Sequence, residues 1–275
     1  TGLTNLADAQ VTVSATKGSA MYDPDHFRLE GQVAIVTGGG AGIGRAIART
    51  FAGAGAAVVV SDLRPDDADE AANEIQRSGG RAVAVACDVT EPDDLARLVD
   101  TANERFGSLT TLVSNAGGGG PKPFDMDMAD FRRAYELNVF SLFQLAQLAA
   151  PLMEDAGGGA ILAITSMAAE NTNQRMASYG SSKAAANHLI RNIAFDLGPH
   201  NIRVNGVAPG ATRTEALESV LNDEVEAQML THTPIKRLGL PSDIANAALF
   251  LCSPAAAWIS GQIITVSGGG HQELD

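Results

Sequence analysis

From about residue 32 onward, short apolar runs alternate with longer stretches in which apolar residues return every three or four positions. The short runs predict buried strands, and the longer stretches predict amphipathic helices. Seven strands are predicted, at 33–37, 57–61, 82–86, 111–114, 160–165, 202–209 and 262–267. Helices are predicted at 42–54, 66–78, 92–106, 129–154, 176–197 and 241–253, with a helical insertion near 215–231.

This order of strands and helices predicts an α/β fold in which a doubly wound parallel sheet carries helices on both faces. Such a sheet binds its ligands at the carboxyl ends of the strands. No break in composition divides the chain, so we expect one domain at 29–275 after a flexible N-terminal extension at 1–28. The insertion at 213–235 is expected to be a substrate lid, because long insertions at this edge commonly carry function.

Two of the predicted helices, at 131–154 and 176–197, are apolar over more than one face. Helices of this kind are buried either in a large core or against another subunit. We favour the second explanation, which predicts an oligomer.

Composition narrows the classes of partner. The 275 residues are 45% hydrophobic, enough for a sizeable core, and the net charge of −13 disfavours nucleic acid and anionic membrane surfaces as partners. Cys87 and Cys252 lack the spacing of a redox pair, and the five histidines lack the spacing of metal ligands, so no metal is expected. Because no membrane-length apolar run or secretory leader is present, we expect a cytoplasmic protein.

The stretch around Ser166, Tyr179 and Lys183 carries the candidate chemistry. Ser166 follows a predicted strand, and Tyr179 and Lys183 lie four residues apart on one face of the next helix. A nearby ammonium favours a phenolate, so we expect Lys183 to lower the pKa of Tyr179 toward working pH. The tyrosine would then serve as a general base for an alcohol proton, and Ser166 would hold the same oxygen. The alternative is a serine at a strand end beside an unrelated surface pair.

A glycine-rich turn at 37–44 follows the first strand and opens the first helix. Glycines there let the backbone approach a pyrophosphate, whose charge faces the amides of the helix N-terminus. The glycines are Gly38, Gly42 and Gly44. Asp62 ends the second strand, where its carboxylate would accept hydrogen bonds from an adenosine ribose and repel a 2′-phosphate. This favours NAD over NADP. The alternative interpretation is that Asp62 is only a turn or helix-capping residue.

Two further polar residues, Asp88 and Asn115, also end predicted strands. We expect them along the same cleft, near the adenine and the cofactor, unless they merely close turns between strand and helix.

Taken together, the glycine turn, Asn115-Ala116-Gly117, Asn138, Ser166, Tyr179-x-x-x-Lys183 and Pro209-Gly210 resemble the short-chain dehydrogenase/reductase family. The resemblance covers roughly 29–275 and implies a Rossmann-type domain, NAD as cofactor and a homotetramer. It implies that Tyr179 is the acid/base, that Ser166 positions the reacting oxygen and that Lys183 binds the nicotinamide ribose. It also implies that Asn138 holds a proton-relay water. The remaining cofactor contacts that it implies are Ile43, Leu63, Val89, Pro209, Thr212, Arg213 and Thr214.

Four stretches resemble one branch of that family, the bacterial 7α-hydroxysteroid dehydrogenases. They begin at Asn115, Thr165, His232 and Ser260. This resemblance implies reversible oxidation of the 7α-hydroxyl of a bile acid to the 7-oxo form. It places the steroid against Gly119, Ser166, Asn171 and Tyr179.

Two alternatives stay open. One is a dehydrogenase of another secondary alcohol, such as a 3-hydroxyacyl group or a sugar alcohol. The other is a dinucleotide-binding sensor without turnover, which would need the glycines and Asp62 but not Ser166, Tyr179 and Lys183 together.

Overall fold

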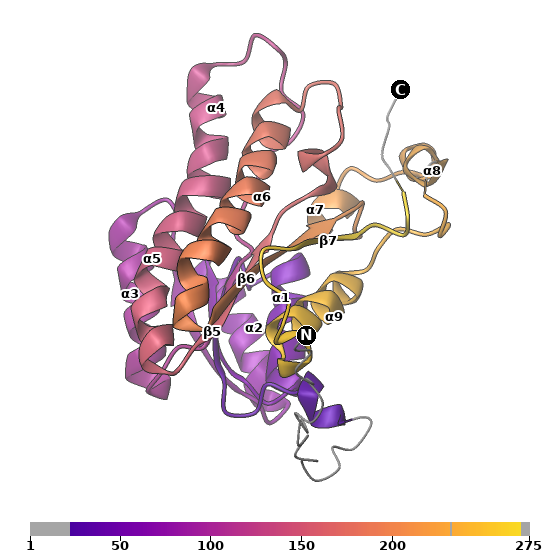
Figure 1. Ribbon diagram of the computed structural model, residues 1–275. Coiled ribbons are helices and arrows are strands. Elements are labelled where there is room, and N and C mark those ends of the chain that lie inside the picture. Colours follow the sequence, from indigo (N-terminus) through magenta and orange to yellow (C-terminus); the bar gives the residue numbers. More distant parts are fainter. Residues whose placement is uncertain (1–22, 232, 271–275) are drawn as a thin grey trace, which may run out of the picture.

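The computed structural model describes residues 23–231 and 233–270, and its centre is a sheet of seven parallel strands (Figure 1). The strand order is β3-β2-β1-β4-β5-β6-β7, and every neighbouring pair is parallel. The strands are β1 (Val33–Thr37), β2 (Ala57–Asp62), β3 (Arg81–Ala86), β4 (Thr111–Ser114), β5 (Gly159–Ile164), β6 (Ile202–Pro209) and β7 (Ile263–Val266).

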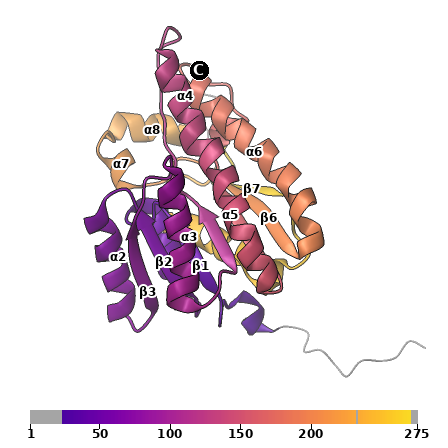
Figure 2. The same cartoon turned by 90° about the vertical axis from the view of Figure 1, so that its left-hand side faces the viewer.

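Helices cover both faces of this sheet (Figure 2). One apolar core lies between the sheet and α3 (Pro92–Phe106), α5 (Ser141–Asp155) and α6 (Ala177–Leu197). The second core lies between the opposite face and α1 (Gly42–Gly53), α2 (Pro65–Arg77) and α9 (Pro241–Cys252). Every residue of β1 is buried, because both faces of a doubly covered parallel strand are dry. The predicted doubly wound α/β fold with seven parallel strands is confirmed.

The predicted helix at 129–154 is not one regular helix. It consists of α4 (Met128–Tyr135), the π-helical turn η2 (Glu136–Phe140) and α5. A π-turn inserts one residue into the α-helical repeat and changes the direction in which the following side chains point. Asn138 lies inside this turn, so the irregularity falls on a predicted site residue.

Two short helices, α7 (Glu215–Glu218) and α8 (Asp223–Thr231), fall within the predicted lid. Neither contains a buried residue, so few apolar contacts hold this segment to the domain. Most of the predicted N-terminal extension lies outside the described residues. Its last part forms the 3-10 turn η1 (Pro24–Phe27), where Phe27 stacks on Phe250 of α9 at 6.3 Å between ring centroids.

The topology creates one crevice. From β1 the chain runs outward to β2 and β3, and then returns to the other side of β1 with β4. The crevice lies outside the carboxyl ends of the strands at this reversal, which is where such sheets bind ligands. No helix within the described ranges is both long and apolar enough to cross a membrane.

Candidate active site

The glycine turn between β1 and α1 has a backbone that other residues would distort. Gly38 and Gly42 have φ of 60° and 53°, in the left-handed region. A Cβ on Gly44 would overlap the carbonyl oxygen of Gly38, while a Cβ on Gly42 would meet only Thr214, at 3.4 Å. The turn therefore packs tightly on its inner side and leaves backbone exposed beside Thr214. This shape fits a pyrophosphate above the N-terminus of α1.

Asp62, at the carboxyl end of β2, braces this turn. Its Oδ2 accepts a hydrogen bond from the Gly40 backbone N–H at 3.0 Å, and its Oδ1 accepts one from the Arg64 N–H at 3.1 Å. A Cβ on Gly40 would lie 2.9 Å from Asp62 Oδ2, so glycine is required there as well. Asp62 is thus a turn residue, as the alternative interpretation held, and it also places a carboxylate at the edge of the crevice.

Asn115 and Asp88 also bond to the backbone at the strand ends. The Asn115 Nδ2 donates to the carbonyl oxygens of Thr37 and Gly38, at 2.9 and 3.1 Å, and so ties β4 to the glycine turn. The Asp88 Oδ1 accepts hydrogen bonds from the N–H and hydroxyl of Thr90, which hold the pKa of Asp88 below its ordinary value. Both side chains close turns, as the alternative interpretation proposed.

The other residues predicted to bind the cofactor lie around the crevice. Leu63 is exposed, Val89 is buried and Ile43 is partly buried. Pro209 ends β6 and Thr212 follows it, where the Thr212 hydroxyl donates to the Gly210 carbonyl at 3.0 Å. Arg213 points into the predicted lid instead, where its Nη2 lies 2.7 Å from Glu226 Oε1 of α8. Its guanidinium is therefore already paired with a carboxylate.

The catalytic candidates converge from three elements. Ser166 follows β5, and its Oγ accepts a hydrogen bond from the Ala168 N–H at 3.1 Å. The same side chain is a hydrogen-bond partner of the Tyr179 phenol, on the first turn of α6. Lys183, one turn further, is buried, donates from Nζ to the Ile164 carbonyl at 2.9 Å and lies 5.8 Å from the centroid of the Tyr179 ring.

Asn138 completes the group. It is buried in η2, and its Nδ2 donates to the Gly118 carbonyl at 2.9 Å and to the Ser182 Oγ at 3.0 Å. Its Oδ1 accepts a hydrogen bond from the Gly118 N–H at 3.1 Å. Both N–H donors of the amide are therefore used within the protein. A water held by Asn138 would therefore have to donate to the second lone pair of Oδ1 or to the backbone carbonyl, and the relay role of Asn138 stays a prediction.

The sequence predicts that Lys183 lowers the pKa of Tyr179. For the polypeptide without a bound cofactor, this prediction is wrong. Burial raises the pKa of Tyr179 above its ordinary value, and the hydrogen bond from Ser166 offsets only part of that rise. The lysine responds to the same environment, because burial lowers the pKa of Lys183 to about 8. Desolvation disfavours the charged form of each group and is the largest cause of both shifts.

The predicted substrate residues flank the tyrosine. Gly119 has φ of 135°, and a Cβ at this position would lie 2.6 Å from Cδ2 of Tyr179. Asn171 lies beside a cavity of about 490 Å³ that Met167, Ile235 and Gly268 also line. Its Nδ2 is buried and has no hydrogen-bond partner among the described residues. A buried amide donor without a partner is costly, which marks Asn171 as a candidate to bind a ligand oxygen.

Comparison with known proteins agrees with this geometry. A family model described as enoyl-(acyl carrier protein) reductase matches residues 38–271. The 7α-hydroxysteroid dehydrogenase of Escherichia coli strain K12 is 66% identical over 255 residues, which span 93% of this chain and 100% of that enzyme. The chain belongs to the short-chain dehydrogenase/reductase family. A cis-4-hydroxycyclohexanecarboxylate dehydrogenase of Sinomonas cyclohexanicum is 40% identical and covers 86% of this chain and 96% of its own length.

Solved structures of other short-chain dehydrogenases/reductases share the fold. A 7α-hydroxysteroid dehydrogenase complexed with NADH and 7-oxo glycochenodeoxycholic acid gives a TM-score of 0.91 at 65% identity, and the match covers 93% of this chain and 100% of that one. A short-chain type dehydrogenase/reductase from Mycobacterium marinum gives a TM-score of 0.85 at 36% identity and covers 90% and 98% of the two chains.

Sequence reasoning named Gly117 as part of the Asn115-Ala116-Gly117 motif, but it assigned no role to two other residues of this short-chain dehydrogenase/reductase site, Thr37 and Ser182. A Cβ on Gly117 would lie 2.7 Å from Asn138 Oδ1 and 3.2 Å from Lys183 Nζ. The Thr37 hydroxyl accepts hydrogen bonds from the N–H groups of Asn115 and Ala116, both at 3.0 Å. Ser182 is the other residue without an assigned role. Thr37 ends a strand and gave the same signal as Asp62, whereas nothing in the pattern separates Ser182 from its neighbour Ser181.

Proposed function

We propose that this protein is an NAD-dependent 7α-hydroxysteroid dehydrogenase, which reversibly oxidises the 7α-hydroxyl of bile acids to the 7-oxo form. The observation that carries the proposal is that Ser166, the partly buried Tyr179 and Lys183 come together, with Lys183 Nζ 5.8 Å from the centroid of the tyrosine ring. It occurs in a chain 66% identical to an enzyme of that name.

The residues present fit a dinucleotide. The exposed backbone at Gly42 leaves room for a pyrophosphate, and the carboxylate of Asp62 suits an adenosine ribose whose 2′-hydroxyl is free. A 2′-phosphate would be repelled there, which favours NAD over NADP. Two of the three Lys183 Nζ donors remain for the nicotinamide ribose after the bond to Ile164. NAD supplies the hydride acceptor for oxidation and, as NADH, the donor for reduction.

The chain's own side chains handle the proton and the orientation. In oxidation the Tyr179 oxygen accepts the proton of the substrate hydroxyl, and the Ser166 hydroxyl donates a hydrogen bond to the same substrate oxygen. Lys183, charged below its pKa of about 8, stabilises the phenolate that this step requires. Since desolvation raises the pKa of Tyr179, the ammonium of Lys183 and the hydroxyls of a bound nicotinamide ribose would together have to lower it in the complete site.

A steroid fits the space on the substrate side. Gly118 and Gly120 carry no side chain that would narrow the wall beside Tyr179, and a Cβ on Gly120 would meet nothing within 4 Å. The cavity beside Asn171 is bordered by Ile235, the last residue of the segment at 213–235, which we propose to be the substrate lid. The unpaired Asn171 Nδ2 offers a hydrogen bond to a substrate oxygen. A large, rigid and mostly apolar ligand with few polar groups matches such a site.

The test is NADH formation with a panel of bile acids and simple secondary alcohols. Hydride transfer and proton transfer must be satisfied in one pose, so only one epimer at one carbon should react. Chenodeoxycholic and cholic acids should be oxidised, whereas ursodeoxycholic acid, the 7β epimer, and deoxycholic acid, which lacks a 7-hydroxyl, should not. Equal activity on the 7β epimer would reject the 7α assignment. Turnover of simple alcohols alone would favour a different dehydrogenase, and NAD binding without any turnover would favour the sensor.

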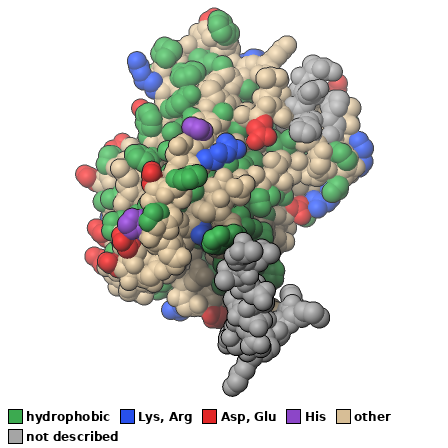
Figure 3. All heavy atoms as spheres, in the orientation of Figure 1, with side chains coloured by type: hydrophobic (Ala, Val, Ile, Leu, Met, Phe, Trp, Pro, Cys, Tyr) green, Lys and Arg blue, Asp and Glu red, His purple; other side chains and the backbone are tan. Residues whose placement is uncertain are grey.

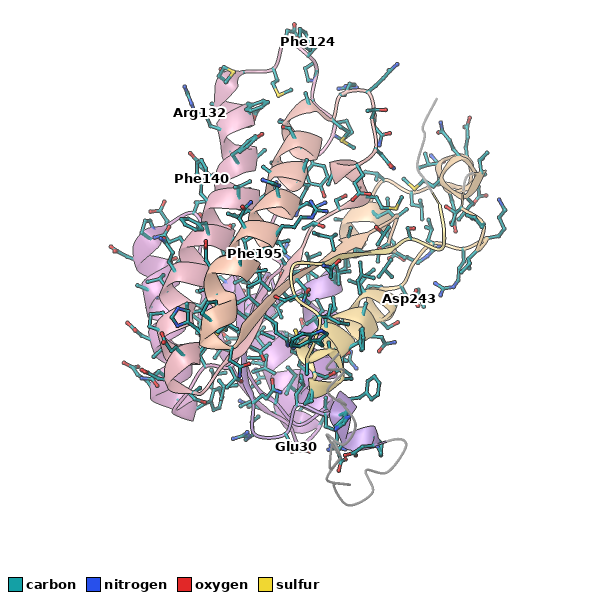
Figure 4. All side chains as sticks on the ribbon, in the orientation of Figure 1. Glu30, Phe124, Arg132, Phe140, Phe195 and Asp243 are labelled. Atoms are coloured by element: carbon teal, nitrogen blue, oxygen red, sulfur yellow. The ribbon has the colours of Figure 1, made fainter. Side chains whose placement is uncertain are left out.

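We further propose that the enzyme is a homotetramer. Large apolar side chains are exposed in two regions of the surface, and hydrophobic side chains are visible among the exposed atoms in Figure 3. On the first, Phe140 is 59% and Phe195 is 87% exposed, and both project from the η2–α6 side of the molecule (Figure 4). On the second, Trp258 is 100% exposed, just beyond α9. Two self-complementary faces on one chain generate a tetramer with three two-fold axes.

Light scattering after gel filtration tests the assembly. Phe140→Glu or Phe195→Glu should disrupt the interface at the first face and dissociate the tetramer into dimers. Trp258→Glu should have the same result by disrupting the interface at the second face. A monomeric wild-type protein would reject the proposal.

We place the enzyme in the cytoplasm, since Cys87 and Cys252 are both buried as free thiols and a reducing compartment keeps them so.

A further inference from the structure

Ser182 lies between Tyr179 and Lys183 on α6, and its side chain is fully buried. Its Oγ lies 2.8 Å from the Tyr179 carbonyl oxygen and 3.0 Å from the Asn138 Nδ2. An amide nitrogen only donates, so the Ser182 oxygen accepts from Asn138 and gives its own hydrogen to the Tyr179 carbonyl. The hydroxyl therefore joins the π-helical turn to the catalytic turn of α6 in a single orientation.

The contacts form a closed circuit around the tyrosine. The Asn138 side chain accepts a hydrogen bond from the Gly118 N–H and donates one to the Gly118 carbonyl. The second N–H of the Asn138 amide donates to the Ser182 hydroxyl. Ser182 holds the Tyr179 backbone, and Gly119, the next residue of the wall, lies against the Tyr179 ring. The distance between the glycine wall and the phenol is thereby set through one buried hydroxyl.

We propose that Ser182 is a positioning residue, which aligns Tyr179 with the glycine wall through Asn138. The inference rests on the proposed dehydrogenase activity. Without the Ser182 oxygen, one Asn138 N–H would be buried without a partner, a cost that is relieved by rotating the amide or moving the Gly118 loop. Either movement displaces the wall from the phenol, and hydride transfer is sensitive to such shifts.

The neighbouring Ser181 separates this role from an ordinary helix contact. Its Oγ also donates to carbonyls of its own helix, those of Ala177 and Ser178, but the residue is exposed. A serine that bonds back to the preceding turn is common and carries no wider role. The two serines differ in the bond from Asn138, so Ser181→Ala is the matched control for Ser182→Ala.

The test compares Ser182→Ala, Ser182→Cys and Ser181→Ala with the wild type, using an alcohol that the wild type oxidises. For each protein one measures kcat, KM, NADH binding by fluorescence, the melting temperature and the kinetic isotope effect with substrate deuterated at the reacting carbon. We expect Ser182→Ala to lower kcat roughly 10–100-fold and to raise the isotope effect, with NADH affinity within about twofold of the wild type. Ser182→Cys, which keeps a weaker donor and acceptor, should recover part of the rate, and Ser181→Ala should match the wild type.

The outcomes separate the two ideas. A wild type that oxidises no alcohol overturns the proposed function and the positioning role with it. An active wild type together with an unchanged kcat and isotope effect in Ser182→Ala overturns the positioning role alone. A Ser182→Ala protein that loses NADH binding and thermal stability in proportion to turnover also overturns it, because the serine would then serve the fold as a whole.

Discussion

Gly119 and Tyr179 are 60 positions apart in the sequence, yet a single methyl group on the glycine would lie 2.6 Å from the tyrosine ring. The tyrosine side chain therefore packs directly against the Gly119 backbone. Because Gly119 also has φ of 135°, both its conformation and its neighbour require glycine. The acid/base candidate is thus held in place by the same wall that borders the proposed substrate space.

The first prediction concerns this contact. Gly119→Ala should push the Tyr179 ring away and strain the loop, so turnover should fall by at least about tenfold. Gly120→Ala is the control, since a Cβ there meets nothing within 4 Å and its φ is not in the left-handed region. Steady-state kcat and KM for both variants check this. Equal activity of the two variants would contradict the packing argument.

The second prediction concerns proton transfer. Tyr179→Phe removes the hydroxyl bonded to Ser166 while keeping the ring against Gly119, so the fold and NAD binding should survive. Loss of general acid–base catalysis should lower kcat roughly 10²–10⁴-fold or more. Turnover and cofactor affinity are measured on the same preparation. A variant with near-normal turnover would remove Tyr179 from the mechanism.

The third prediction concerns stability against pH. The pKa of Lys183 falls from 10.5 to about 8 on burial, so between these values the unfolded chain binds more protons than the folded one. The lysine's contribution to the free energy of unfolding should therefore rise with pH across this window, by on the order of 3 kcal/mol. Below pH 8 the full cost of burying the charge remains, and above 10.5 it is gone.

Lys183→Met is the comparison for this effect. Burial raises the pKa of Cys87 to about 11 and of Cys252 to about 12, so these thiols oppose the trend as pH rises through the ordinary thiol value. The wild type and Lys183→Met both contain these two thiols, so the thiol contribution cancels in the difference between their free energies of unfolding. Urea unfolding from pH 7 to 10 should show the wild type gaining stability relative to the variant. A constant difference would contradict the predicted shift in the Lys183 pKa.

The fourth prediction concerns cofactor choice. Asp62→Ala removes a ribose acceptor and a charge that repels a 2′-phosphate, so the preference for NAD over NADP should narrow. The variant also loses the bond to the Gly40 N–H, so a lower melting temperature is expected. Values of kcat/KM with both cofactors decide the matter. If the wild type itself preferred NADP, the assignment of Asp62 would be reversed.

Local sequence pattern alone determined the order and bounds of most elements of this protein. Apolar periodicity and strand-ending polar residues are properties of consecutive positions, and they located all seven strands and the helices α1, α3 and α6 to within one or two residues. The spacing of Tyr179 and Lys183 is equally local, because one helical turn places them on the same face. The glycine turn and Asp62 could be identified from the sequence because each lies at the end of a predicted strand.

The tertiary structure decided the features that depend on distant residues. The π-helical turn that orients Asn138, the link from Asn138 to Ser182 across 44 positions and the contact of Gly119 with Tyr179 join different elements. No local periodicity encodes such pairs. The predicted direction of the Tyr179 pKa shift is wrong for the same reason. The shift depends on how much water the whole fold excludes from the phenol. The four-residue spacing brings the Tyr179 phenol and the Lys183 ammonium near each other, and burial decides the direction in which each pKa shifts.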